Sequence, residues 1–207
     1  MNKKIILHLC ADTGSDSFYY SIDPEYEVIL VGSKIGVENY HPPKNVHGII
    51  ANPPCLEFST ARLGGKSRNH DDGMKLVKEC QRIIEEANPV WWVIENPGTG
   101  RLRDYLGKPV ATYQPYQYGS PWTKKTSLWG NFNMSPPIYK KWEDVPTRIP
   151  HLWIKQGRNK PSLAHQHKSA IYYIDELYRF HDSIDNDTAF RSLCSQKFAK
   201  AFKEANQ

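Results

Sequence analysis

Long hydrophobic runs, paired cysteines and blocks of one charge are all scarce in this chain of 207 residues. The longest apolar run covers residues 90–94, whereas a membrane-spanning helix needs about 20 residues. The four cysteines include no C-x-x-C pair, which argues against a zinc module and is typical of reduced cytosolic thiols. The first residues lead into His8 without a cleavage-site pattern, so we expect no signal peptide. These absences predict a cytoplasmic protein without a metal site.

What the chain does contain is an excess of positive charge and many aromatic side chains. Lys and Arg number 27 against 22 Asp and Glu, which gives a net charge of +5, and 25 residues are Phe, Trp or Tyr. A basic balance of this size favours polyanionic partners. The length corresponds to one domain rather than two, with room for an insertion. We therefore expect a single domain over residues 1–207.

Apolar segments and turn signals alternate along the first half of the chain. Buried strands are expected at 4–9, 27–32, 47–51 and 90–94, the last closed by Glu95-Asn96-Pro97. A helical period covers 72–87, with Asp71 or Asp72 as its N-cap, and a second helix is expected at 195–205. Strands that alternate with helices predict an α/β fold with a largely parallel sheet and flanking helices.

Residues 131–183 differ in composition from the rest of the chain. Prolines at five positions stand among Tyr, Trp, Lys and Arg, with little periodicity. An irregular surface loop explains this pattern. A small recognition insert with side chains that stack on bases and bind phosphates explains it as well. The two interpretations are compatible.

Two residues at the expected strand ends are candidates for chemistry. Cys55 follows a rigid Pro-Pro corner, where a fixed thiol can act as a nucleophile, although most lone cysteines are small buried hydrophobes. Glu95 follows five apolar residues, where desolvation would raise its pKa and suit it to proton donation, although a structural hydrogen bond to the turn explains it equally well. The loop 10–15 has one glycine and by itself indicates only a tight turn.

Taken together, these segments resemble the DNA (cytosine-5)-methyltransferases, in particular small phage or prophage members. The resemblance is carried, in order, by a cofactor-loop segment, a Pro-Pro-Cys segment with Phe58-Ser59, a Glu-Asn-Pro segment, a Tyr-Gly-x-Pro segment and a C-terminal helix, found here at 10–15, 53–55, 95–97, 118–126 and 198–206. It implies an S-adenosylmethionine-dependent methyltransferase of the Rossmann-like type in a bacterial or phage-infected cell.

The resemblance also implies roles for individual residues. Cys55 would add to C6 of a flipped cytosine, Glu95 would hold its N3 and amino edge, and Lys124 would contact the base or a phosphate. S-adenosylmethionine would be bound by Cys10, Ala11, Asp12, Thr13, Gly14, Ser15 and Pro54. DNA would be held by Ser59, Arg101, Arg103, Lys124, Lys140, Lys141, Arg158 and Lys160.

The chain departs from the family pattern at several positions. Two family arginines fall on Lys124 and Thr126, and a glutamine falls on Trp122. The strand at 27–32 is followed by Ser and Lys where the family has an acid for the cofactor ribose, with Glu38 a few residues further on. The short insert implies that the chain recognises a short DNA sequence or has relaxed sequence specificity, or that a partner subunit supplies target recognition.

Two other functions stay open from the sequence. A degenerate methyltransferase that binds DNA without catalysis would explain the altered loop and the missing arginine. The segment 52–54 also resembles the Asn-Pro-Pro corner of N4-cytosine and N6-adenine amino-methyltransferases, but Cys55 stands where those enzymes carry a stacking aromatic ring.

Overall fold

The computed structural model describes residues 3–11, 13–58 and 69–207 of the chain. Its contacts divide the chain into two compact units. Unit 1 comprises residues 1–112 and 126–132, and unit 2 comprises 113–125 and 133–207. Whether the two units act as the single domain that we expected stays a prediction.

A six-stranded sheet of order β2-β1-β3-β4-β6-β5 organises the fold. Its strands are β1 (Lys4–Leu9), β2 (Tyr26–Val31), β3 (Val46–Ala51), β4 (Trp91–Pro97), β5 (Ala111–Tyr113) and β6 (Thr126–Asn131). The first four pair in parallel, and β6 runs antiparallel to β4. The α/β class and the largely parallel sheet are therefore confirmed.

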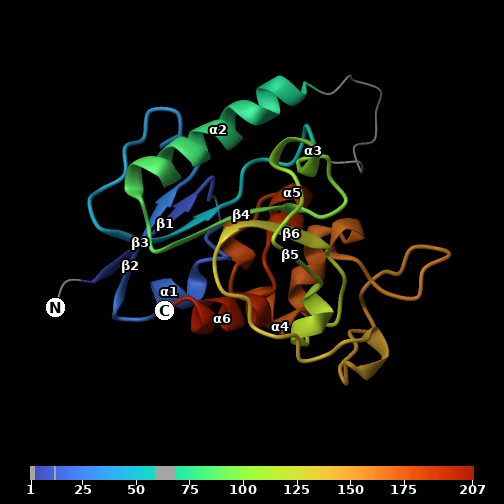
Figure 1. The fold of residues 1–207 in the computed structure, drawn as a ribbon. Helices are drawn as coiled ribbons and strands as arrows, with labels where there is room; N and C mark the ends of the chain where they lie inside the picture. Colours follow the sequence, from blue (N-terminus) through green and yellow to red (C-terminus); the bar gives the residue numbers. More distant parts are fainter. Residues whose placement is uncertain (1–2, 12, 59–68) are drawn as a thin grey trace. The chain divides into compact units, whose positions relative to one another are not determined.

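Helix α2 (His70–Ala87) lies along one face of the parallel strands (Figure 1). Its buried positions Val77, Cys80, Ile83 and Ile84 pack against alternate residues of the strands, such as Leu7 and Ile49. The opposite face carries Trp91, whose indole occupies the space where a side chain on Gly48 would be, since an added Cβ would lie 2.2 Å from the ring. Tyr20 of α1 (Phe18–Ser21) stacks on Trp91 at 5.6 Å. Two covered faces explain why these strands are almost wholly apolar.

Two boundaries differ from those expected by more than one residue. Helix α2 begins at His70 and is capped by Asn69, whose side chain accepts a hydrogen bond from the Asp72 amide; the expected cap at Asp71 or Asp72 is wrong, and both lie in the first turn, where acids favour the helix dipole. Strand β4 does not close before Glu95 but runs to Pro97, because β6 pairs with it as far as Pro97–Thr126.

Unit 2 has its own core, although most of its elements are single turns. Tyr113 stacks on Phe198 at 3.6 Å, and Trp122 and Phe190 are fully buried. Its elements are η1 (Pro115–Tyr118), η2 (Trp142–Asp144), η3 (Leu163–His165), η4 (Lys168–Tyr173), α4 (Asp175–Tyr178), η5 (His181–Ser183), α5 (Asp187–Ser192) and α6 (Gln196–Ala205). Short α3 (Arg103–Leu106) belongs to unit 1. No helix among the described residues is long and apolar enough to cross a membrane.

Candidate active site

The sheet register brings three polar residues together on the face opposite α2. His8 pairs with Ile50 and Ala51 pairs with Ile94, and the Asn52 amide donates to the Leu9 carbonyl at 3.0 Å, which continues the ladder. Because side chains alternate along a strand, His8, Asn52 and Glu95 project from the same face at the carboxyl ends of three adjacent strands. This edge is where ligands bind in open parallel sheets.

The Pro-Pro-Cys corner is attached to the neighbouring strand through Asn96. Asn96 is 1% exposed, and its side-chain amide donates to the Pro53 carbonyl at 2.9 Å. Proline has no N–H, so this carbonyl is one of the few polar groups by which the corner can be held. Half-buried Cys55 follows, and its carbonyl accepts a hydrogen bond from the Phe58 amide at 3.0 Å. Exposed Pro54 stands between them, consistent with a position that lines a ligand.

Glu95 is held by the side chain of Asn52. The amide nitrogen of Asn52 lies 3.1 Å from Oε2 of Glu95 and 3.3 Å from Oδ1 of Asp16. Its amide oxygen lies 2.7 Å from Nε2 of His8, and Nδ1 of His8 lies 2.8 Å from the Ser17 hydroxyl. A chain of hydrogen bonds therefore joins Glu95 to the segment that follows the predicted cofactor loop.

His8 is 2% exposed, and burial lowers its pKa, although the charge of Asp16 and the hydrogen bond to Asn52 act in the opposite direction. A neutral ring has one N–H. Because the Asn52 nitrogen must face two carboxylates, its oxygen faces His8, and the proton of His8 belongs on Nε2. Nδ1 then accepts from the Ser17 hydroxyl at 2.8 Å, which is the shorter of two contacts that this hydroxyl can donate to, since the Gly14 carbonyl lies 3.3 Å from it.

The predicted cofactor loop begins with an unusual backbone conformation at Cys10. Its φ is +55°, a region that L-residues seldom adopt, and its sulfur lies 3.8 Å from that of Cys80 on α2. Ala11 and Ser15 are buried, Thr13 is half-buried, and Gly14 has a φ of +67° that suits glycine. Asp12 lies outside the described residues. The Ala11 amide donates to the Val31 carbonyl at 3.3 Å, which holds the loop beside β2.

The carboxylate of Glu38 influences the pKa of Cys80, which contacts this loop. The hydrogen bond to Cys10 raises the pKa of the Cys80 thiol most, burial raises it further, and the charges of Glu79 and Glu38 add to the effect. Glu38 thus lies close enough to Cys80 to influence it, and Cys80 contacts the first residue of the loop. Among the described residues, no three His, Cys, Asp or Glu side chains gather as a metal site.

The residues predicted to bind DNA fall in both units. Arg101 and Arg103 are exposed in unit 1, where the Arg101 amide donates to the Phe58 carbonyl at 2.9 Å and so lies beside the turn after Cys55. Its guanidinium pairs with Asp104 at 3.0 Å. Ser59 lies outside the described residues. The other predicted residues, Lys124, Lys140, Lys141, Arg158 and Lys160, belong to unit 2.

Lys124 is engaged at a helix end within unit 2. Its ammonium donates to the carbonyls of Ser192 and Leu193 at 2.7 and 3.0 Å, the last carbonyls of α5, where a cation is favoured. Sequence reasoning did not anticipate this capping role. Its predicted part in catalysis stays a prediction.

The basic residues of unit 2 differ in how strongly they are held. Lys140, Lys141 and Arg158 are exposed, and their side chains form no hydrogen bond or ion pair with the described part of the chain. Lys160 instead lies over the rings of Tyr116 and Trp142, at 5.6 and 6.0 Å from their centroids.

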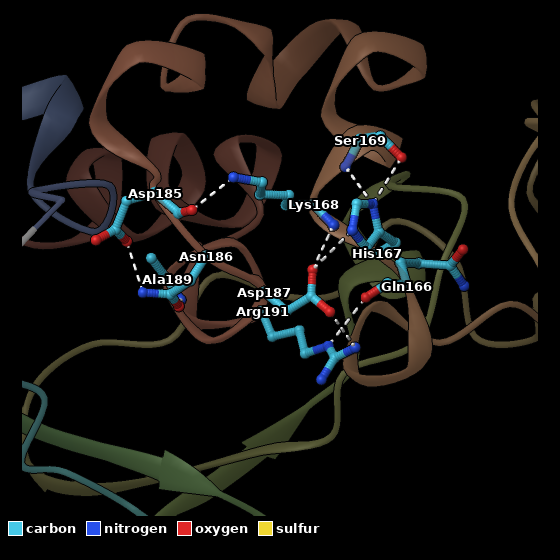
Figure 2. A network of polar contacts seen from close by, with 9 residues as sticks. All are labelled: Gln166, His167, Lys168, Ser169, Asp185, Asn186, Asp187, Ala189 and Arg191. Carbon is cyan, nitrogen blue, oxygen red and sulfur yellow. Dashed lines mark hydrogen bonds and ion pairs between the residues drawn. The ribbon is translucent and has the colours of Figure 1, made fainter.

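Figure 2 shows a polar network that engages two further cations of unit 2. Asp187 accepts from the Lys168 amide at 2.8 Å and from the Arg191 guanidinium at 3.1 Å. Arg191 also donates to the Gln166 carbonyl at 2.9 Å, and the Lys168 ammonium donates to the Asp185 carbonyl at 2.5 Å. These cations stabilise the chain locally, which leaves the exposed lysines and Arg158 as the better phosphate candidates.

Sequence reasoning singled out Cys55 and Glu95, whose roles stay predictions, and missed the groups that hold them. His8, Asn52, Asp16 and Ser17 form a polar network that is buried at His8 and Ser17, and Asn96 anchors the corner. One signal was available: a histidine in an otherwise apolar strand must find hydrogen-bond partners when it is buried.

Comparison with known proteins bears on the family to which this chain is similar. Residues 26–99 match the family model described as C-5 cytosine-specific DNA methylase, a segment that includes Cys55 and Glu95. The resemblance to DNA (cytosine-5)-methyltransferases is thereby confirmed.

A curated relative from Frog virus 3 (isolate Goorha), named as a DNA (cytosine-5)-methyltransferase, is 32% identical over 100 residues, which cover 42% of this chain and 47% of the relative. The chain thus spans about half the length of the curated relative that it matches.

Two solved structures are similar over part of the chain. One is a prophage-encoded protein of E. coli assigned as a DNA modification methyltransferase, with 14% identity, a TM-score of 0.45 and coverage of 64% of this chain and 49% of that one. The other is the Entamoeba histolytica methyltransferase EhMeth, with 10% identity, a TM-score of 0.45 and coverage of 68% and 58%.

Proposed function

We propose that the chain transfers a methyl group from S-adenosylmethionine to C5 of cytosine in DNA through a covalent intermediate on Cys55. One observation carries the proposal: Cys55 and Glu95 stand at the ends of adjacent strands whose corners are joined by two hydrogen bonds, Asn96 to Pro53 at 2.9 Å and Asn52 to Glu95 at 3.1 Å. The family match over 26–99 supports it.

The residue types suit the steps of this reaction. The Cys55 thiolate forms a bond to C6 of the cytosine, and the electron pair of the C5–C6 double bond then takes the methyl group. Glu95 holds the N3 and amino edge and offsets the charge that develops on the ring. Loss of the C5 proton to a base restores the double bond and breaks the bond between sulfur and C6. Bound S-adenosylmethionine supplies the methyl group and leaves without it.

The same proposal covers the binding partners. The loop from Cys10 to Ser15 and Pro54 would hold the methyl donor, with Glu38 toward its ribose. DNA would be bound with the target cytosine flipped out of the stack, and the exposed cations of unit 2 would contact phosphates. We also propose that the chain acts in the cytoplasm of a bacterial or phage-infected cell, as part of a restriction-modification system. A partner subunit would supply target recognition.

Covalent trapping tests the proposal. Random-sequence DNA in which every cytosine is 5-fluorocytosine, offered as duplex and as single strands with S-adenosylmethionine, should form an adduct that survives SDS, because fluorine at C5 cannot leave as a proton does. Mass spectrometry should place the adduct on the peptide with Cys55. Cys55→Ser should abolish it, and the matched variant Cys194→Ser, at a buried thiol in unit 2, should not. Methylation that persists in Cys55→Ser would contradict the proposal.

A further inference from the structure

A single side-chain amide holds two carboxylates in the candidate site. The Asn52 nitrogen has two hydrogens, and it lies within hydrogen-bond distance of Glu95 (3.1 Å) and Asp16 (3.3 Å). Each hydrogen therefore has its own carboxylate. Two carboxylates that share one donor repel each other when the donor is removed. The Ser15 hydroxyl also donates to Asp16, at 3.1 Å, so the amide contributes to the position of each carboxylate.

The orientation of this amide is itself fixed. Rotating it by 180° would place its oxygen against both carboxylates and its nitrogen against the Nε2 proton of His8, which lies 2.7 Å from the present oxygen. His8 cannot turn in response, because its other nitrogen is engaged by Ser17 at 2.8 Å and the ring is buried. With the two carboxylates on one side and the Nε2 proton on the other, only one orientation of the Asn52 amide gives each of its polar atoms a complementary partner.

We propose that Asn52 is the positioning residue for Glu95 and that His8, through its Nε2 proton, holds Asn52 in the required orientation. The inference rests on the proposed function, in which Glu95 must meet the edge of a flipped base. Asp16 lies just after the predicted cofactor loop, so the same amide makes the position of Glu95 depend on that loop. Well-oriented catalytic groups lose about 100-fold in rate when displaced by about 1 Å, which sets the scale of the effect.

A double-mutant cycle tests the positioning role. Asn52→Ala should slow adduct formation with 5-fluorocytosine duplex about 100-fold and leave the apparent affinity for that DNA unchanged. Glu95→Gln should slow it at least as much. At saturating S-adenosylmethionine, where an effect of Asp16 on cofactor binding does not limit the rate, the double variant should be no slower than Glu95→Gln alone. If the two effects multiply, Asn52 does not act through Glu95 and the proposal is overturned.

Variants at His8 separate positioning from a general loss of stability. His8→Leu removes the donor to Asn52 and should slow adduct formation in the same non-additive way, whereas His8→Gln keeps an N–H and should restore part of the rate. Ile50→Val truncates a core side chain beside His8 on the paired strand and should lower the melting temperature without a comparable loss of rate. A rate loss in Ile50→Val that matches His8→Leu would overturn the role of His8.

A spectroscopic measurement does not depend on activity. ¹⁵N NMR of His8 in the full chain should show a neutral ring protonated on Nε2, and Asn52→Ala should change that signal. A ring protonated on Nδ1 would overturn the proposal even if the enzyme is active. A wild-type chain that forms no adduct would instead overturn the proposed function, and the positioning role with it, even when the NMR signal is as expected.

Discussion

Glu38 is the acid that we propose for the ribose of the methyl donor. The expected strand end has no acid, yet the charge of Glu38 acts on Cys80, which contacts Cys10 at 3.8 Å. If Glu38 receives the ribose hydroxyls of S-adenosylmethionine, Glu38→Gln should weaken its binding about 10–150-fold, the loss expected for one charge-assisted hydrogen bond. Calorimetry measures this directly.

The matched control for this variant is Glu79→Gln. The charge of Glu79 also acts on Cys80, but its carboxylate is engaged by Arg82 at 2.7 Å on α2, so we expect its affinity for S-adenosylmethionine to be that of the wild type. Equal affinity in both variants would exclude Glu38 from the cofactor site.

Single residues also show what the sequence could predict. Cys55 and Glu95 were found because apolar strands followed by Pro or Asn mark the carboxyl edge of a sheet, a local pattern. The contact of His8 with Asn52 and the contact of Lys124 with the end of α5 join residues that lie 44 and 68 positions apart in the chain. No local pattern encodes these contacts.

At the scale of elements, strands were easier to predict than their ends. Strand β1 has the bounds that its apolar pattern predicts, whereas β4 continues to Pro97 only because β6 pairs with it. Proline is tolerated there because it stands at the end of the strand. The expected helix near the C-terminus was correct, and its cap is Ser195, whose side chain accepts from the Phe198 amide.

The start of α6 also holds a half-buried acid, Glu176. Oε2 of Glu176 accepts from the amides of Gln196 and Lys197 at 2.8 and 3.2 Å, and Oε1 accepts from the Ser120 hydroxyl at 2.7 Å. Burial raises the pKa of Glu176, although these hydrogen bonds and the charge of Lys197 oppose the shift. A raised pKa means that the folded chain binds this proton more tightly than the unfolded chain.

The pH dependence follows from that sign. The stability that protonated Glu176 contributes should be complete below its ordinary pKa of 4.5 and should be lost as the pH rises through the raised value. Glu176→Gln should remove this part of the pH dependence, measured by urea unfolding of the full chain across that range. Asp175→Asn, at the exposed neighbouring position, should retain it. An unchanged pH profile in Glu176→Gln would contradict the assignment.

For the whole molecule, the two units divide the charge unequally. Unit 2 contains 14 Lys and Arg against 8 Asp and Glu, a net +6, whereas unit 1 contains 13 against 14, a net −1. The composition shows an overall excess of positive charge, but only the division into units shows that unit 2 carries all of this excess. The chemistry proposed for unit 1 and the cations of unit 2 thus belong to different parts of the chain.

This division predicts how binding to DNA responds to salt. Each phosphate neutralised by Lys or Arg contributes about −0.9 to the slope of log affinity against log salt concentration. Lys140→Gln with Lys141→Gln should therefore make the slope shallower by about 2 and weaken binding uniformly across DNA sequences. Lys44→Gln with Lys78→Gln removes the same charge from exposed positions of unit 1 and should leave the slope nearly unchanged. Fluorescence anisotropy with a random-sequence duplex measures both slopes, and equal changes in the two pairs would mean that net charge, rather than the surface of unit 2, determines DNA affinity.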